Sequence, residues 1–190
     1  MRFIFELIIQ IVHNMKMFKL MTVMSIILMV CTASAQTRSD KKLMLDAIKA
    51  KKTLLKTDSS LEKFFDESAG YVIFPNVGKG GFIIGGASGN GVVYEEGQVI
   101  GMADLKKLNI GLQAGGQAII EVIFFETSTD LDRFKEGKFQ FAAEASAVAL
   151  KSGIAFNAKY KDGVAVFALP KAGLMADASV GGQKFSYDPF

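Results

Sequence analysis

The stretch that decides the fold is GYVIFPNVGKGGFIIGGASGNGVVY, residues 70–94. Eight of its residues are glycine, and Lys79 lies among them. Two structures fit such a composition. One is a loop whose backbone cradles a phosphate, and the other is a β-sheet that bends and turns tightly.

The phosphate-loop interpretation fails on spacing. A P-loop requires serine or threonine directly after the lysine, because that hydroxyl holds magnesium, whereas Gly80 follows Lys79. The dinucleotide spacing GxGxxG also fails, since Ile83 stands at the sixth position counted from Gly78. No helical pattern follows to supply the N–H groups that bind a phosphate. The sequence therefore predicts no nucleotide partner and no cofactor.

Short apolar runs bounded by turn residues continue from Tyr71 onward and predict eight to ten strands. We expect hairpin turns at 88–91, 95–98 and 161–163, where glycine follows asparagine, glutamate or aspartate. Glycines inside the strands would allow sharp coiling and close backbone approach.

Residues 40–56 carry apolar side chains at helical spacing, with lysines opposite. The apolar line consists of Leu43, Ala47, Ala50 and Leu54, flanked by Met44, Ile48 and Leu55. Lys51 intrudes on this apolar arc.

Two further helices are expected. One begins at Ser59, where Glu62 completes a capping box. The other is capped by Ser128 or Thr129 and ends at Gly137. The predicted fold is α+β: a curled antiparallel β-sheet, or barrel-like meander, packed with N-terminal amphipathic helices and one inserted helix.

The first 35 residues resemble a secretory signal peptide. Lysines precede an apolar run at 20–30, and the small residues of ASA end at Ala35. We expect translation to start at Met15 or Met17, cleavage near Ala35, and a single domain at 36–190. The mature chain would be periplasmic or secreted. Lipoprotein anchoring at Cys31 is less favoured, because the bulky Val30 precedes it.

Cleavage would remove His13 and Cys31, the only histidine and the only cysteine. Without them a Ser-His-Asp triad, a Cys-His pair and the usual zinc sites are excluded. The remaining 19 basic and 18 acidic residues would nearly balance, so we expect no nucleic-acid partner. We predict no catalytic residue and no metal ligand.

Seven lysines are candidates for contact with a lipid or membrane: Lys41, Lys42, Lys49, Lys52, Lys56, Lys79 and Lys171. The first five would form either a solvated helix face or a face at an anionic membrane, where each lysine contributes about 1 kcal/mol. Lys79 and Lys171 are expected in glycine-flanked turns, where backbone N–H groups can bind an anion. The alternative is that both are ordinary surface lysines.

Aromatic residues at strand spacing are expected in the core, or else along an acyl-chain pocket. They are Tyr71, Phe74, Phe82, Phe124, Phe125, Phe139, Phe141, Phe156 and Phe167. Glu121 and Glu144 lie within apolar strands. We expect both to face solvent, the alternative being a buried acid with a raised pKa and a function.

Four further motifs follow residues 70–94 along the chain: GLQAGGQ at 111–117, FF at 124–125, ASAVAL at 145–150, and ALPKAGLMADASVGGQKF at 168–185. Together, and in this order, the five motifs resemble the SYLF domain family. The resemblance runs from Leu43 to Phe185. The family's serine-lysine-glycine entry to its last strand is replaced here by Pro170-Lys171-Ala172-Gly173.

This resemblance implies a lipid-binding module, since eukaryotic members bind phosphoinositide-containing membranes, partly through an N-terminal amphipathic helix. Actin binding is known in part of the family and is not expected for an exported chain. The leading hypothesis is therefore a non-enzymatic domain that binds anionic lipid or another amphiphile at the cell envelope. The alternatives are an envelope structural or protein-interaction domain without lipid dependence, and an enzyme that uses carboxylates or a lysine.

Overall fold

The computed structural model describes residues 38–82, 84–114, 116–137, 140–141, 148–172, 176–180 and 183–190. The chain divides into two compact units, residues 1–42 and 43–190. In the first unit, the described residues 38–42 are helical. In the second unit, residues 43–57 are helical, and we call them the lysine helix.

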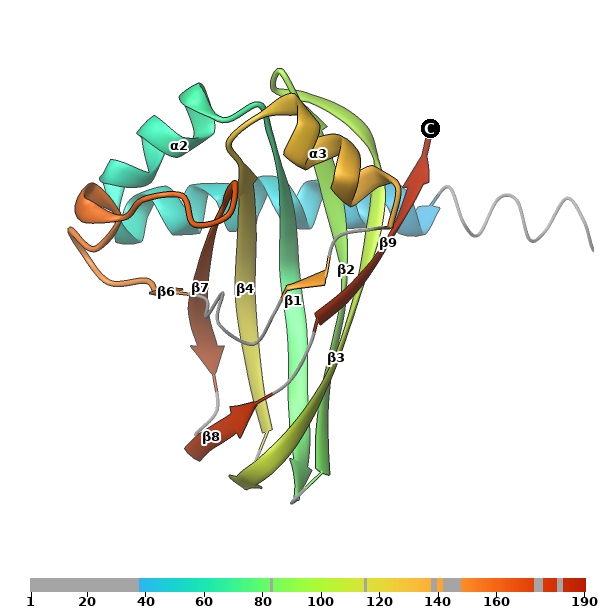
Figure 1. Ribbon diagram of the computed structural model, residues 1–190, viewed down its shortest axis with the longest axis vertical. Helices are drawn as coiled ribbons and strands as arrows, with labels where there is room; N and C mark the ends of the chain where they lie inside the picture. The colour runs from blue at the N-terminus through green and yellow to red at the C-terminus, as the bar shows by residue number, and fades with distance from the viewer. Residues whose placement is uncertain are drawn as a thin grey trace, which may run out of the picture. The chain divides into compact units, whose positions relative to one another are not determined.

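The second unit has an α+β fold in which helices pack on one curled sheet (Figure 1). After the lysine helix the described elements are η1 (Ser59–Leu61), α2 (Glu62–Glu67), β1 (Gly70–Phe82), β2 (Ile84–Glu95), β3 (Gln98–Ala114), β4 (Gly116–Phe125), α3 (Ser128–Lys135), β5 (Gln140–Phe141), β6 (Val148–Ala149), η2 (Ala155–Asn157), β7 (Val164–Ala172), β8 (Ala176–Val180) and β9 (Gln183–Pro189).

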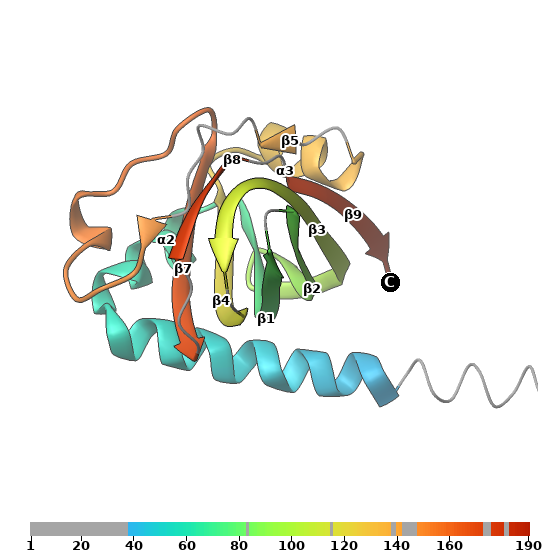
Figure 2. The same cartoon turned by 90° about the horizontal axis from the view of Figure 1, so that it is seen from below.

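The described strands form one sheet in the order β5-β9-β3-β2-β1-β4-β7-β6, and β8 also pairs with β3. All described pairs are antiparallel except β6 and β7, which run parallel. Figure 2 shows the sheet curling from β7 through β1 to β9. The predicted curled antiparallel sheet is therefore confirmed, except that β6 and β7 form a parallel pair that the sequence did not indicate.

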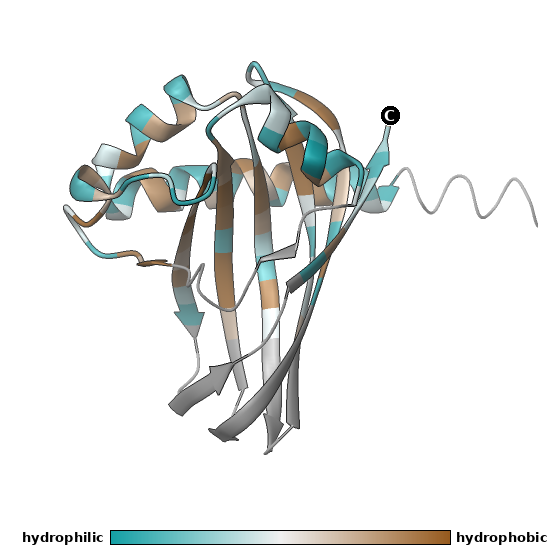
Figure 3. Cartoon of the chain, viewed as in Figure 1, coloured by the Kyte–Doolittle hydropathy of each residue, from teal (hydrophilic) through white to brown (hydrophobic). Residues whose placement is uncertain are grey.

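Among the described residues, β1 and β4 are buried on both faces of the sheet. On one face, the lysine helix and α2 pack on residues such as Ile73 and Val122. On the other face, α3 and β9 cover neighbouring residues such as Val72 and Ile123. Figure 3 shows the resulting hydrophobic colouring along β4 and β1. Successive strand residues therefore belong to two different cores.

Aromatic rings fill the core under α2. The rings of Phe65 and Phe124 meet edge-on with centroids 4.8 Å apart, and those of Phe64 and Phe167 are 5.1 Å apart. Such edge-to-face pairs contribute about 0.5–1.5 kcal/mol beyond the area that they bury. The predicted core positions at Phe124 and Phe167 are confirmed, as are those at Tyr71, Phe74 and Phe125.

Two of the three predicted hairpin turns are confirmed. Glu96 and Gly97 have φ values of 51° and 76°, and Asp162 and Gly163 have 52° and 79°. Positive φ at both central residues is the geometry of a type I′ turn, which matches the twist of the flanking strands. The turn predicted at 88–91 is wrong, because these residues are extended within β2 and pair with β3.

The predicted helix caps are wrong, and in each case an earlier residue caps the helix. Asp58, rather than Ser59, caps η1 by accepting a hydrogen bond from the backbone N of Ser60. Thr127, rather than Ser128 or Thr129, caps α3, because Thr127 has the extended backbone that a cap requires.

The predicted end of α3 at Gly137 fits its φ of 67°, and the cap at its start forms a capping box. In this box the side chain of Asp130 accepts a hydrogen bond from the backbone N of Thr127. Acidic Asp130 in the first turn and basic Arg133 and Lys135 in the last turn also complement the helix dipole.

The glycines of β2 make room for β1. A Cβ added at Gly91 would lie 2.7 Å from Cδ1 of Phe74 and 3.0 Å from the carbonyl oxygen of Ile73. A Cβ added at Gly89 would lie 2.9 Å from the carbonyl oxygen of Asn76. The expectation that strand glycines permit close backbone approach is therefore confirmed at these two positions.

We predict that Gly91→Ala lowers the free energy of unfolding by about 1–3 kcal/mol, because the added methyl overpacks the contact with Phe74. Gly78→Ala is the matched control, since a Cβ at Gly78 meets nothing within 4 Å. Urea unfolding of both variants checks this. Equal stability of the two variants would contradict the close-approach role of Gly91.

Candidate functional site

The outer face of the lysine helix combines basic and apolar side chains. Lys49, Lys52 and Lys56 are exposed and follow one another at spacings of three and four residues, which places them on one side of the helix. Leu45 and Ile48 lie on the same side and are 58% and 48% exposed. We use the name outer face for these five residues.

The opposite side of the lysine helix fixes the direction of the outer face. Ala47, Ala50 and Leu54 are at most 3% exposed and belong to the core under α2. The small alanines let the helix backbone approach the sheet. Ile48, expected at the flank of this buried line, is instead exposed, because it lies on the solvent side of Ala47.

Lys51 explains how a charged residue fits into the apolar arc. Its Nζ donates a hydrogen bond to the hydroxyl oxygen of Tyr71 at 3.2 Å and lies 4.2 Å from the ring centroid of Phe65. Burial lowers the pKa of Lys51, and the nearby Asp66 carboxylate partly opposes that change. The aliphatic stem packs while the ammonium group contacts aromatic rings, an arrangement typical of lysine at an apolar border.

The other predicted lysines lie elsewhere. Lys41 and Lys42 are exposed helical residues of the first unit. Lys79 and Lys171 are not in turns, because β1 extends to Phe82 and β7 to Ala172. The placement of the Lys79 side chain is outside the part of the structure that is described.

Lys171 has a structural contact of its own. Its Nζ donates a hydrogen bond at 3.0 Å to the carbonyl oxygen of Pro75 in β1, although β4 lies between β1 and β7. The register of β1 against β4 shifts between Phe74 and Val77, at the bulge that contains Pro75. Lys171 therefore pairs with a backbone carbonyl at this irregularity of the sheet.

Two residues, Glu121 and Phe156, differ from their expected burial. Glu121 in β4 is 2% exposed, between Phe74 of β1 and Ala168 of β7 in the sheet register, so the expected solvent-facing position is wrong. Phe156 is 79% exposed, so its expected core position is wrong. Glu144, Phe139 and the side chains of Phe82 and Phe141 are outside the described residues.

Asp58 links the end of the lysine helix to a distant loop. Its backbone N donates to the carbonyl oxygen of Leu54 at 2.9 Å. Its carboxylate is 3% exposed and accepts hydrogen bonds from the backbone N of Ala155 at 2.8 Å and from Oγ of Ser60 at 2.6 Å. Residues 153–160, one of the short apolar runs expected to form strands, instead contain η2, and the N–H of Ala155 in this segment is bound to the carboxylate of Asp58.

The pKa of Asp58 reflects these contacts. Burial opposes ionisation of the carboxyl group, but hydrogen bonds from Ser60 and from the backbone of Ala155 and Gly153 outweigh burial and lower the pKa. Sequence reasoning missed Asp58. Its position before Ser59 and Ser60 is nevertheless a common helix-capping signal.

The described residues were also compared with the requirements of a metal site and of a membrane-spanning helix. They contain no group of three His, Cys, Asp or Glu side chains arranged to hold a metal ion. Within the same part of the chain, every helix falls short of the length and hydrophobicity needed to cross a membrane.

The fold and the outer face together define a class: an α+β protein with a curled sheet and an exposed helix face that is both basic and apolar. No family model matches the chain. The chain is 28% identical over 137 residues to beta cell expansion factor A of Aeromonas veronii. The aligned region is 71% of this chain and 52% of that protein, so the chain spans about half the length of the curated relative it matches.

We predict that Asp58→Asn lowers the free energy of unfolding at pH 7 by about 1–3 kcal/mol, because the amide cannot replace the carboxylate as an acceptor of several hydrogen bonds. The folded pKa of Asp58 is lowered. Its contribution is therefore complete above the unfolded pKa of about 3.9 and is lost as pH falls through the lower folded value.

Urea unfolding at pH values from 7 to 2 measures this contribution. The difference between wild type and Asp58→Asn is expected to shrink toward the acid end. Asp188→Asn, at an exposed position of β9, serves as the charge-matched control and is expected to match wild type at pH 7. A pH-independent difference would rule out the carboxylate as its source.

Proposed function

We propose that this chain is a non-enzymatic SYLF-type domain of the cell envelope or of the secreted fraction, and that it binds anionic lipid surfaces through the outer face of the lysine helix. The observation that carries the proposal is the exposure of Leu45 and Ile48 beside Lys49, Lys52 and Lys56. A helix at a membrane interface has this composition, with apolar side chains entering the head-group boundary and lysines meeting anionic head groups.

Two observations support the proposal. One is the motif order, which resembles that of the SYLF family. The other is the absence of histidine and cysteine after residue 35, two side chains on which many enzymes rely as bases and nucleophiles.

The magnitudes favour reversible binding. Three lysines near an anionic surface contribute about 3 kcal/mol in total, or roughly a hundredfold in partitioning. Partial burial of Leu45 and Ile48 adds to this attraction, since full burial of such a side chain contributes about 1.5–3 kcal/mol. The electrostatic share should weaken with salt, because exposed charges are screened over about 8–10 Å at physiological ionic strength.

We predict that replacing Lys49, Lys52 and Lys56 together with glutamine weakens partitioning onto vesicles of phosphatidylglycerol and phosphatidylcholine by about a hundredfold. Co-sedimentation at low ionic strength measures this change. The matched control replaces three exposed lysines of other segments, Lys106, Lys151 and Lys184, with glutamine.

Three results would contradict the proposal. One is equal binding to anionic and purely phosphatidylcholine vesicles, and another is an equal loss in the control variant. The third is capture of an envelope protein by the chain with no binding to any vesicle, which would favour the protein-interaction alternative.

A further inference from the structure

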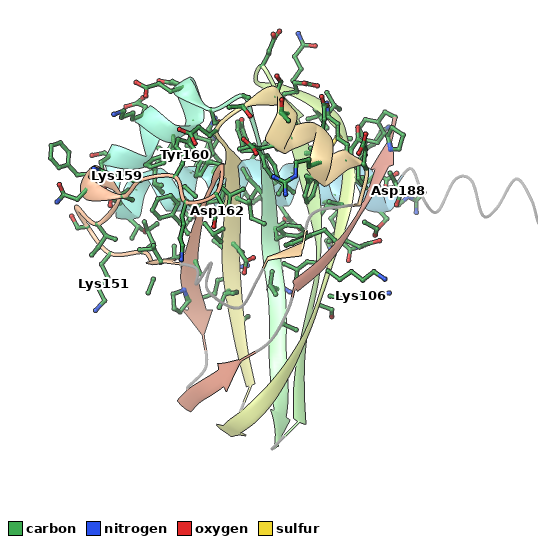
Figure 4. All side chains as sticks on the ribbon, in the orientation of Figure 1. Lys106, Lys151, Lys159, Tyr160, Asp162 and Asp188 are labelled. Atoms are coloured by element: carbon green, nitrogen blue, oxygen red, sulfur yellow. The ribbon has the colours of Figure 1, made fainter. Side chains whose placement is uncertain are left out.

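A groove of about 860 Å³ lies between η1 and α2 on one side and residues 155–160 on the other. Its walls include three aromatic side chains, Phe64, Phe156 and Tyr160. The rings of Phe64 and Tyr160 are tilted against each other with centroids 5.4 Å apart. Tyr160 and its neighbour Lys159 are labelled beside α2 in Figure 4.

The groove has a negative balance of charge. Four carboxylates and two ammonium groups line it: Glu62, Asp66, Glu67 and Glu126, with Lys63 and Lys159. The one ion pair between these groups among the described residues joins Lys63 and Glu67 at 3.9 Å, and both side chains are more than 60% exposed. Beyond this pair, three carboxylates remain in the lining against the single ammonium group of Lys159.

Besides burial, two of the carboxylates, Glu126 and Glu67, raise the pKa of the same groove residue, Tyr160. Burial raises the pKa of the Tyr160 hydroxyl to about 12, with further contributions from the negative charges of Glu126 and Glu67. Glu126 follows β4, whereas Glu67 ends α2. Segments far apart in the sequence thus bring negative charge to one aromatic residue.

Phe156 is the other unusual feature of the groove. It is 79% exposed on a loop that the buried carboxylate of Asp58 holds in place through the backbone N of Ala155. A single exposed apolar side chain is common on protein surfaces. Here, however, this exposed aromatic side chain is one of the residues that line the groove.

Other ligand chemistries fit this groove less well. An anionic group would meet the excess of carboxylates. A metal ion requires a compact set of ligands, and the described residues hold no group of three suitable side chains. An organic cation gains from both features, because ammonium groups bind aromatic faces and carboxylates attract them. The volume lies within the range of about 300–1,000 Å³ that is usual for small-molecule sites.

We propose that this groove binds a small organic ammonium cation, with Phe156 and Tyr160 contacting its apolar surface and Glu67 and Glu126 supplying the counter-charge. A free amine and the amine-bearing head group of a zwitterionic phospholipid share this chemistry. The site uses none of the residues of the outer face, so the inference stands apart from the proposed function.

A tryptophan reporter tests the proposal directly, because the chain contains no tryptophan. In the full chain carrying Phe156→Trp, choline chloride and 1,4-diaminobutane are each expected to give a saturable change in fluorescence at constant ionic strength. Sodium chloride at the same ionic strength should give none. Isothermal titration calorimetry of the unaltered chain with the same two amines is expected to show binding as well.

Charge-matched variants locate the site. Glu67→Gln combined with Glu126→Gln is expected to weaken amine binding at least tenfold, whereas Glu96→Gln combined with Asp188→Asn, at exposed positions elsewhere, should leave it unchanged. Phe156→Ala is expected to weaken binding, while Phe190→Ala should not, although Phe190 is also a largely exposed phenylalanine, at 68%. Circular dichroism confirms that each variant is folded.

Vesicles of phosphatidylcholine or phosphatidylethanolamine distinguish the two sources of the cation. A response of the Phe156→Trp variant to the soluble amines together with a blue shift on these vesicles identifies the lipid head group as a source of the cation. A response to the soluble amines with no response to the vesicles identifies a free ligand. The proposal is overturned if the soluble amines give no saturable response, or if both double variants weaken binding equally.

Discussion

Residues of β1 and β4 are buried on both faces of the sheet, and this constraint governs the second unit. Val72, Ile73 and Phe74 are each 0% exposed, although successive side chains point to opposite faces. The sheet therefore needs two covers, and the lysine helix with α2 supplies one while α3 and β9 supply the other. Because the apolar line of the lysine helix must face the sheet, the five residues of the outer face are turned toward solvent.

The fold was predictable where local chemistry decides the structure. The two type I′ turns at 96–97 and 162–163 follow from residues that tolerate positive φ. Residues 88–91 have similar local chemistry and yet continue β2, because the space that Gly89 and Gly91 leave is taken by the backbone and side chains of β1. That difference arises from a neighbouring strand, which local sequence does not report.

The surfaces proposed to bind ligands also combine features that were predictable from the sequence with features that were not. Exposure of Lys49, Lys52 and Lys56 follows from helical periodicity alone and was predicted. The exposure of Phe156 was not predictable from the apolar pattern of residues 153–160. The backbone of this segment is held by a hydrogen bond from the N–H of Ala155 to the carboxylate of Asp58, 97 residues away in the sequence, which a local pattern does not report.

Net charge conceals how the fold distributes charge. The whole chain carries a formal +3, which alone indicates no strongly charged partner. The period of one helix gathers three lysines on the outer face, whereas α2 and Glu126, which follows β4, bring an excess of carboxylates to the groove. A ligand responds to charges within about 8–10 Å. Surfaces of opposite sign on different elements can therefore select ligands of opposite charge, whatever the total.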